Sequence, residues 1–437
     1  MAGIALSGQS DPDKTTLDQA QSVGPGRGTM AKTRKIIAVI FGGRSVEHDV
    51  SVLTGLQFLD ALDAERFEGL PVYIAPDGSW WSGEALRRRS LYPVAASKSE
   101  ELIPVSLDIA AGPVGQPALK TVRKGLLRPK VEYIPFDLMV PAIHGTNGED
   151  GSLQGLLEFA DIPYAGSNCM ASAITMDKHA TKRLLAPTGV PMLPHALVPR
   201  REEGGLLPQS DIAAHLADGL GEEPDFPLCV KPQRLGSSVG VTKAEEAGDL
   251  SAALIAVYRM DSAAIVEPFV PNLVEYNIAV SRAFGHTRLS AIERPLRGAD
   301  VLDFKDKYLA GGTGGPKLDD VPLEGMASSS REIDPKDLTD EQRAVIEDAA
   351  RTAFDVLGLA GSARIDFLSN GETGDIWFNE INSIPGSFAY YLWEAASPQV
   401  SFTELTTALI SEGLGRAATR ASDTSAATGG ARIFDRG

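Results

Sequence analysis

A continuous apolar run that ends in two glycines most constrains the fold of this chain. Residues 35–43 read KIIAVIFGG, and an unbroken Ile/Val/Phe run of this length predicts a strand buried on both faces, as in a parallel sheet. Apolar residues recur at helical spacing through residues 47–63. Paired glycines let the backbone turn tightly and approach a ligand. Strand, glycine turn and helix together predict the first unit of a doubly wound α/β domain.

A second apolar segment, DLMVPAIHG at residues 137–145, predicts another strand, ending at His144 and Gly145. The polar loop TNGEDG and a helix follow it. His144 would lie at the mouth of the sheet, where α/β folds place ligands. A structural role is the alternative for a lone histidine. Between the two segments, residues 90–130 carry scattered Pro, Gly and Lys and predict an irregular excursion.

Composition limits the classes of function. The chain has 437 residues, enough for two or three domains, and a formal net charge of −17, which argues against nucleic acid as a partner. No apolar run approaches the roughly 20 residues that cross a bilayer. Its two cysteines, Cys169 and Cys229, favour a reducing cytosol over a disulfide framework. Residues 1–30, with Met30 as a candidate start, and 416–437 are polar or small-residue stretches that predict a disordered leader and tail.

The middle of the chain predicts a helix containing MDKHATKRLLA, a strand FPLCVKPQ and the Gly/Ser-rich loop RLGSSVGV, followed by strands at 263–270 and 275–284. Further on, Thr339 and Gln342 predict a capping box. The helix after it is expected to end at Gly358 and Gly361, and its expected apolar face consists of Val345, Ile346, Ala349, Ala353, Val356 and Leu357.

The segment SARIDFLSNGETGDIWFNEIN, residues 362–382, predicts a hairpin. Residues two apart in a strand share a face, so Arg364 lies beside Asp366 and Glu380 beside Asn382. If the two faces coincide, one patch carries an arginine, two carboxylates and an amide. Hard oxygen ligands suit magnesium, which keeps water and substrate phosphates as its other ligands. A solvated strand face, with Arg364 as a structural partner of Asp366, is the alternative.

The ordered set of motifs resembles the D-alanine–D-alanine ligases of the ATP-grasp superfamily over roughly residues 35–412. The matching motifs are FGGRSVEHDVS, HGTNGEDGSLQGLLE, MDKHATK, VKPQRLGSSVGV, DKYL, ARIDF and NEINSIPG. The resemblance implies an α/β, ATP-grasp, three-domain ligase with an N-terminal doubly wound parallel sheet and two α+β domains that clamp ATP. The expected divisions are a 31–166 N-terminal domain, a 167–262 central subdomain and a 263–415 C-terminal subdomain.

The resemblance also implies an activity. Such an enzyme is an ADP-forming ligase that joins two D-alanines through an acyl phosphate for peptidoglycan precursor synthesis. ATP and Mg²⁺ or Mn²⁺ are the expected cofactors, D-alanine and ATP the small-molecule partners, and a cytoplasmic homodimer the expected form. Neither nucleic acid nor membrane is an expected partner.

Site residues follow position by position from the resemblance. Asp366, Glu380 and Asn382 would hold the metal. Lys178, Lys231, Ser238, Glu267, Glu275 and Lys307 would bind ATP. Glu47, Ser237, Tyr308, Arg364 and Gly386 would be catalytic, and His144 and Leu392 would contact substrate. Each has a simpler alternative. For the lysines it is a surface charge, and for the Gly/Ser loop it is a plain surface loop. For Glu47 it is a helix-dipole partner, and for Glu275, whose alignment is one residue uncertain, it is an exposed strand residue.

Two features depart from the family pattern. Tyr391 stands where many members have a small hydroxyl residue that contacts the second substrate, which puts that contact in doubt. Residues 309–330 form a long Gly-rich segment that predicts a lid over the second site. Two other functions stay open. One is a ligase that joins D-alanine to another D-amino acid or a D-hydroxy acid. The other is a non-catalytic nucleotide sensor, although no metal ligand or phosphate lysine is lost.

Overall fold

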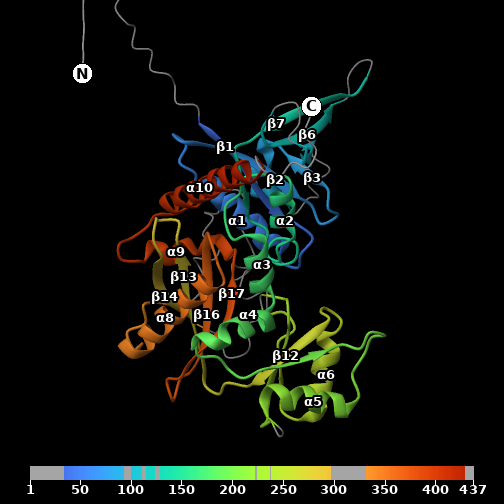
Figure 1. Cartoon of the computed structure of the whole chain (residues 1–437), viewed down its shortest axis with the longest axis vertical. Helices are drawn as coiled ribbons and strands as arrows, with labels where there is room; N and C mark the ends of the chain where they lie inside the picture. Colours follow the sequence, from blue (N-terminus) through green and yellow to red (C-terminus); the bar gives the residue numbers. More distant parts are fainter. Residues whose placement is uncertain are drawn as a thin grey trace, which may run out of the picture. The chain divides into compact units, whose positions relative to one another are not determined.

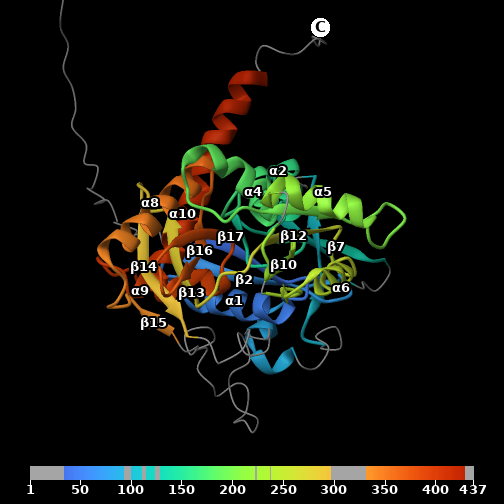
Figure 2. The same ribbon diagram turned by 90° about the horizontal axis from the view of Figure 1, so that it is seen from below.

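The computed structural model of the chain describes residues 34–92, 100–110, 115–123, 128–221, 224–236, 238–296 and 331–428, with the side chains of 423–428 left out. These residues form one compact unit with four sheets, from a mixed N-terminal sheet, parallel around β1, to a C-terminal antiparallel one (Figures 1 and 2). No helix in the described ranges has both the length and the apolar character needed to cross a membrane.

The predicted first unit is confirmed. Strand β1 (Lys35–Gly42) pairs in parallel with β2 (Phe67–Ile74) and β8 (Leu138–Pro141), and β3 (Trp80–Ser82) and β4 (Ile103–Pro104) extend the sheet in the order β4-β3-β2-β1-β8. Alternate β1 residues point to opposite faces. Val39 packs in the core that includes helix α1 (His48–Asp60), and Ile40 packs in the core that includes α2 (Ser152–Phe159). The second strand ends at Pro141, four residues before the predicted end.

The prediction that residues 90–130 are irregular is wrong. This segment contributes β4 and also β5 (Ser106–Asp108) and β6 (Ala118–Arg123), which form a small antiparallel sheet with β7 (Lys130–Pro135). The short 3-10 helices η1 (Glu84–Arg87) and η2 (Arg89–Leu91) precede β4. These strands are short and polar on one side, so their alternation is too brief to stand out among the prolines and glycines.

The central sheet has the order β11-β10-β12-β9 and is entirely antiparallel. Its strands are β9 (Ala196–Pro199), β10 (Leu228–Pro232), β11 (Thr242–Ala244) and β12 (Ala263–Pro268). Helices α5 (Gln209–Leu220) and α6 (Ala247–Val257) share its core. The boundary predicted at 262 therefore falls too early, because β12 pairs with both β10 and β9 and belongs to this sheet.

The C-terminal sheet runs in the order β15-β14-β13-β16-β17. Its strands are β13 (Leu273–Ser281), β14 (Arg288–Pro295), β15 (Arg331–Ile333), β16 (Ser362–Asn370) and β17 (Ile376–Asn382). Helix α8 (Asp340–Val356) covers one face, and its capping box is confirmed. Ile346 and Ala353 are buried as predicted, but Val345 and Val356 are exposed.

Two segments cross the predicted domain divisions. Helices α3 (Cys169–Met176) and α4 (Lys178–Leu185), with η4 (Ala186–Thr188) after them, contribute Ala171 and Leu185 to the core of the C-terminal sheet rather than to the central one. After β17, η6 (Gly386–Ala389), α9 (Tyr390–Glu394) and α10 (Phe402–Thr428) return to the N-terminal core, and α10 contacts β8 (Figure 1). The disordered tail predicted from residue 416 is wrong as far as 428, where the helix ends.

Candidate active site

Polar residues form two rows across the open face of the C-terminal sheet. In one row Asn277 of β13 is paired with Asp366 of β16, which is paired with Glu380 of β17. In the adjacent row Arg364 faces Asn382. Directly opposed residues project to the same side of a sheet. The prediction that the two hairpin faces coincide is therefore confirmed.

A β-bulge adjusts this face beside Glu380. The pairing of β16 and β17 shifts between Asp366 and Phe367, which leaves Asn379 as an extra residue. Bulges of this kind re-aim a side chain, often next to an active site. The Asn379 Oδ1 accepts a hydrogen bond of 2.9 Å from the Nζ of Lys231, which lies on the central sheet. The bulge therefore ties the two sheets together beside the predicted metal ligands.

Asp366 is held by two neighbours on this face. The Nε and Nη2 atoms of Arg364 donate to its two carboxylate oxygens, both at 2.7 Å, and Asn382 Nδ2 donates to Oδ2 at 3.0 Å. Burial opposes the charge of Arg364, but Asp366 raises the arginine pKa well above its usual value. The ion pair considered as the alternative for Arg364 is therefore present in the structure.

The donor set fits a hard cation. Asp366, Glu380 and Asn382 offer only oxygen ligands, from facing strands and on one side of the sheet, which is the chemistry that magnesium prefers. Within the described ranges no group of three or more His, Cys, Asp or Glu side chains could hold a metal. The predicted set is of a different type, with two carboxylates and an amide.

Lys178 begins helix α4 and reaches this face. Asp177 caps the helix by accepting from the Ala180 N–H. The buried Lys178 Nζ donates to the Leu235 carbonyl at 2.6 Å and lies 3.1 Å from Oε2 of Glu380. Lys178 therefore links the Gly/Ser-rich loop to the predicted metal ligand.

Glu267 of β12 is buried between two lysines. Its carboxylate forms ion pairs with Lys182 and, at 2.7 Å, with Lys231. Burial acts to raise the pKa of Glu267, but the two lysines outweigh it and lower the pKa to about 2. Sequence reasoning missed Lys182. The available signal was its spacing of four residues from Lys178, one helical turn further along α4.

Glu47 precedes α1 and is 7% exposed. A Cβ on Gly145 would lie 2.5 Å from its Oε2 atom, and a Cβ on Gly236 would lie 3.5 Å from Oε1. Two glycine backbones thus approach the carboxylate closely. Glu47 also lines a narrow pocket together with Lys178, Glu149 and residues of the C-terminal sheet, Glu380 and Asn382 among them. The predicted first-substrate residue and two of the three predicted metal ligands therefore share one pocket.

Glu149 is a second residue that sequence reasoning missed. Its two carboxylate oxygens accept from the backbone N–H groups of Gly145, at 2.8 Å, and Ile384, at 3.0 Å. Burial, reinforced by the charge of Glu47, raises the pKa of Glu149 to about 8. It therefore joins the loop after β8 to the loop after β17. The signal was its place in GTNGEDG, between the predicted His144 and the following helix.

His144 is buried, and its ring takes part in a hydrogen-bond network with α1 and the turn after Gly386. Its Nε2 lies 2.8 Å from Thr54 Oγ1, and Thr54 Oγ1 also accepts from the Ser387 N–H at 3.0 Å. Burial lowers the pKa of His144 to about 4, although a hydrogen bond with the Ile384 backbone raises it. The ring is thus neutral at pH 7, and it braces α1 against the turn at Gly386. Substrate contact by His144 stays a prediction.

Gly386 opens a turn of unusual backbone. Ser387, Phe388 and Ala389 all have positive φ, between 53° and 54°, a region that costs energy for residues with a Cβ. The turn is fixed by the Thr54 contact and by the Ser387 hydroxyl, which donates to Gln57. Because Gly386 is the first residue of η6, its N–H has no partner within the turn.

The remaining predicted residues vary in how far the structure places them. Ser237, Lys307 and Tyr308 lie outside the described residues, as does the lid 309–330. Ser238 lies within the Gly/Ser-rich loop RLGSSVGV and has a φ of 57°. Glu275 lies on β13 two residues from Asn277, on the same face. Leu392 is fully buried in the N-terminal core.

Tyr391, where the family pattern is broken, belongs to a buried polar cluster. Its hydroxyl donates to Glu293 Oε1 at 3.1 Å, and the guanidinium carbon of Arg331 lies 3.9 Å from its ring centroid. Arg331 Nη1 in turn donates to Glu293 Oε2 at 2.7 Å. Arg364 also interacts electrostatically with the Tyr391 hydroxyl. Tyr391 is thus tied to the sheet face that carries the predicted catalytic arginine.

A mixed N-terminal sheet followed by two antiparallel sheets, which are tied together by the hydrogen bond from Lys231 to Asn379, places the chain among proteins of the ATP-grasp fold. Residues 36–167 match the family model of the D-ala D-ala ligase N-terminus, and residues 184–411 match that of the C-terminus. The chain belongs to the D-alanine–D-alanine ligase family, which confirms the resemblance seen in the sequence.

Individual relatives agree over most of the chain. The D-alanine–D-alanine ligase of Geobacillus kaustophilus is 33% identical over 391 residues, covering 87% of this chain and 95% of the relative. That of Corynebacterium aurimucosum is 31% identical, covering 87% and 98%. Among solved structures, the D-alanine-D-alanine ligase of Coxiella burnetii aligns with a TM-score of 0.70 at 24% identity, covering 90% and 97%. The VanG D-Ala:D-Ser ligase of Enterococcus faecalis aligns with a TM-score of 0.65 at 26% identity, covering 86% and 99%.

Proposed function

We propose that this chain is an ADP-forming ligase that joins two D-alanines through an acyl phosphate and supplies the dipeptide for peptidoglycan precursors. The observation that carries the proposal is the shared pocket of Glu47, Lys178, Glu380 and Asn382 in a chain of this family. We further propose that it acts in the cytoplasm as a homodimer.

ATP would lie between the central and C-terminal sheets. Lys178 and Lys231 are held near Glu380 and Glu267 by ion pairs, and both would turn their ammonium groups to the phosphates. Glu275 is the proposed ribose ligand on the same sheet face. Asp366, Glu380 and Asn382 would hold Mg²⁺, which when bound neutralises charge that develops on the transferred phosphoryl group.

The first D-alanine would bind with its ammonium group at Glu47. Its carboxylate oxygen attacks the γ-phosphorus, the bond to the bridging oxygen of ADP breaks, and an acyl phosphate forms. Glu149 and His144 would act as positioning residues in this step. They fix the loops after β8 and β17 without a net charge at pH 7, so they leave the charge of Glu47 available to the substrate.

The second D-alanine must attack as the free amine. Its nitrogen bonds to the acyl carbon, a tetrahedral oxyanion forms, and the nitrogen loses its proton as phosphate leaves. Arg364 and the N–H of Gly386 would stabilise the oxyanion, because donors fixed in advance are worth most where charge develops. The Gly386 donor would be aimed by the left-handed turn that follows it.

Acceptor choice is the finer question. In the family, tyrosine at the position of Tyr308 accompanies D-alanine as acceptor and phenylalanine accompanies tolerance of D-lactate. Tyr391 supports a second candidate function, a ligase for another D-amino acid or a D-hydroxy acid, because a half-buried aromatic ring stands where a small hydroxyl residue is common.

The test is a coupled ADP-release assay with a panel of D-amino acids and D-lactate, followed by product analysis with two acceptors at equal concentration and two pH values. We expect D-Ala–D-Ala and little depsipeptide at pH 7. Tyr308→Phe should raise the depsipeptide share about ten- to hundredfold, the effect of losing a buried hydroxyl on which others depend. Wild-type preference for D-lactate or D-serine at pH 7 would instead assign acceptor choice to Tyr391 and the Gly-rich segment.

A further inference from the structure

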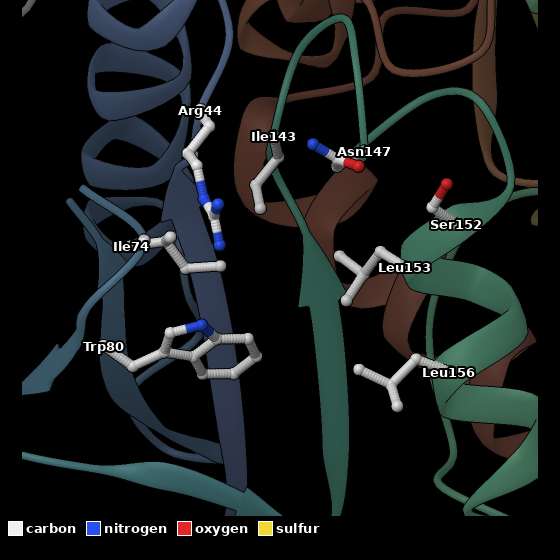
Figure 3. A pocket seen from close by; sticks show the side chains of 10 residues that line it. Arg44, Ile74, Trp80, Ile143, Asn147, Ser152, Leu153 and Leu156 are labelled. Atoms are coloured by element: carbon white, nitrogen blue, oxygen red, sulfur yellow. The ribbon is translucent and has the colours of Figure 1, made fainter. Parts of the chain in front are cut away.

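A second cavity lies at the carboxyl ends of the parallel strands, on the side of the sheet that α2 covers (Figure 3). Its volume is about 330 Å³, within the range of small-molecule sites. It shares no lining residue with the pocket around Glu47. The lining residues are Gly43, Arg44, Ile74, Gly78, Trp80, Ile143, Asn147, Ser152, Leu153 and Leu156.

Arg44 supplies a positive charge to this cavity. Figure 3 shows its guanidinium extending along one wall toward Ile74 and Trp80. It passes directly over Gly78, where a Cβ would lie 2.5 Å from its Nε atom. Among the described residues it has no ion pair within 4.0 Å. Asp77, on the same turn, feels its charge, but the Asp77 Oδ1 atom already accepts from the N–H and hydroxyl of Ser79.

The opposite wall adds polar groups above an apolar floor. The Asn147 amide points into the cavity and Ser152 lies at its rim, while Trp80, Leu153 and Leu156 line the lower part (Figure 3). Asp150 lies between Asn147 and Ser152 in the chain. Its carboxylate accepts from the backbone N–H groups of both residues, at 2.8 and 3.0 Å, and thereby fixes the backbone from which the two polar side chains project.

We propose that this cavity binds a small amphipathic organic carboxylate. A guanidinium pairs with a carboxylate through two parallel hydrogen bonds, and Asn147 can add a third. The Trp80 ring and the two leucines would take an apolar body about the size of one aromatic ring. A neutral ligand of the same shape would leave Arg44 desolvated and without its counter-charge.

The occupant would be coupled to the first-substrate site, an extension that rests on the proposed function. Arg44 precedes Glu47 by three residues, and Ile143 directly precedes His144. Gly145 lies against both Ser45 and Glu47. The two loops that form the upper walls of the cavity are thus the loops that fix Glu47. A ligand that changes their spacing changes the affinity for D-alanine, and D-alanine changes the affinity for the ligand by the same factor.

Titration calorimetry with 4-phenylbutanoate and 4-phenylbutanamide tests the site on the full chain. We expect the carboxylate to bind at least tenfold more tightly than the amide, and Arg44→Gln to remove that preference. Trp80→Ala should weaken both probes, whereas Arg34→Gln, an exposed arginine on the same domain, should change neither. The proposal is overturned if the wild type binds the two probes equally, or if it binds neither at about 10 mM, an order-of-magnitude limit. Both results come from the wild type alone and do not depend on how a variant folds.

The coupling is read from the KM for D-alanine at the first site. With saturating 4-phenylbutanoate we expect a change of at least twofold in the wild type and none in Arg44→Gln. Tight, Arg44-dependent binding with an unchanged KM would overturn the coupling and leave the site. Absence of ligase activity without any probe is a separate result, which would reject the proposed function and not the carboxylate site.

Discussion

The candidate active site has two sides that hold their polar groups in opposite ways. The sheet side is formed by the central and C-terminal sheets, and the loop side by the loops of the N-terminal domain. On the central and C-terminal sheets each charge faces an opposite charge: Glu267 lies between Lys182 and Lys231, and Arg364 holds Asp366. On the loops of the N-terminal domain, His144 and Glu149 are buried as neutral groups, with pKa values of about 4 and about 8.

The difference indicates what each side is for. Paired charges stay ionised, so lysines and carboxylates can exchange partners when phosphate and metal arrive. Neutral buried groups cannot attract substrate at long range. They hold backbone N–H and hydroxyl donors in place, and the free-energy cost of burying them is that of desolvation alone. Substitutions on the sheet side should therefore change charge and stability, and those on the loop side should change position and pH dependence.

The largest expected effect is on stability, from Lys182→Met. The Lys182 side chain is 1% exposed and paired with Glu267, and removing one partner of a buried ion pair costs about 3–5 kcal/mol. Urea titration measures the free energy of unfolding. Lys243→Met on β11 of the central sheet is the control, because its pair with Glu245 is exposed and should contribute at most about 1 kcal/mol. Equal effects of the two variants would contradict the role assigned to burial.

Next in size is Glu380→Gln, which should lower ADP formation by about 10²–10³ while the fold survives. The reason is the loss of one charged group of the proposed metal site, beside Asp366, and of the partner of Lys178. Turnover is measured at saturating magnesium, with Glu372→Gln at the exposed hairpin turn as control. Near-normal turnover of Glu380→Gln would count against the metal assignment.

A smaller, pH-dependent effect is expected from Glu149→Gln. Because the pKa of Glu149 is raised to about 8, the folded wild type holds a proton that the unfolded chain releases above pH of about 4.5. The contribution of Glu149 to wild-type stability therefore falls as pH rises from about 5 to 8, by at most about 1.4 kcal/mol per pH unit.

Glutamine does not titrate, and it keeps only one of the two side-chain oxygens that accept from the backbone N–H groups of Gly145 and Ile384. We expect Glu149→Gln to be clearly less stable than the wild type at pH 5 and to approach it by pH 8.5, as measured by urea titration at several pH values. His144 titrates in both proteins, and its contribution cancels. A stability difference that is independent of pH would mean that Glu149 is ionised in the folded protein.

Deletion of residues 1–29 should have the smallest effect, with unchanged turnover and unfolding. The segment has no periodic apolar face and no motif residue. ADP-release assays measure the turnover of the shortened chain, and urea titration measures its free energy of unfolding. Loss of activity or of folding would show that residues 1–29 have a role outside both the sheet side and the loop side of the site.

Local sequence signals predicted the elements that carry the site. The apolar run before Gly42, the capping box at Thr339 and the period-two spacing within Arg364–Asp366 and within Glu380–Asn382 each rest on near neighbours in sequence, and each is found in the structure. Short strands within 90–130 were missed because their pattern lasts only a few residues. Likewise β12 was assigned to the wrong domain, because pairing with β9 and β10 joins segments more than 30 residues apart.

The sequence by itself thus determined the family and the main strands and helices around the site, and it supplied the candidate residues for phosphate, metal and substrate, because residue type and short spacing encode them. Only the tertiary structure decided which groups are charged and which loops are joined. Lys182 and Glu267 are 85 residues apart in sequence, and Glu149 and Ile384 are 235 apart. Their ionisation depends on burial and on neighbours brought in by distant segments, and no local pattern contains that information.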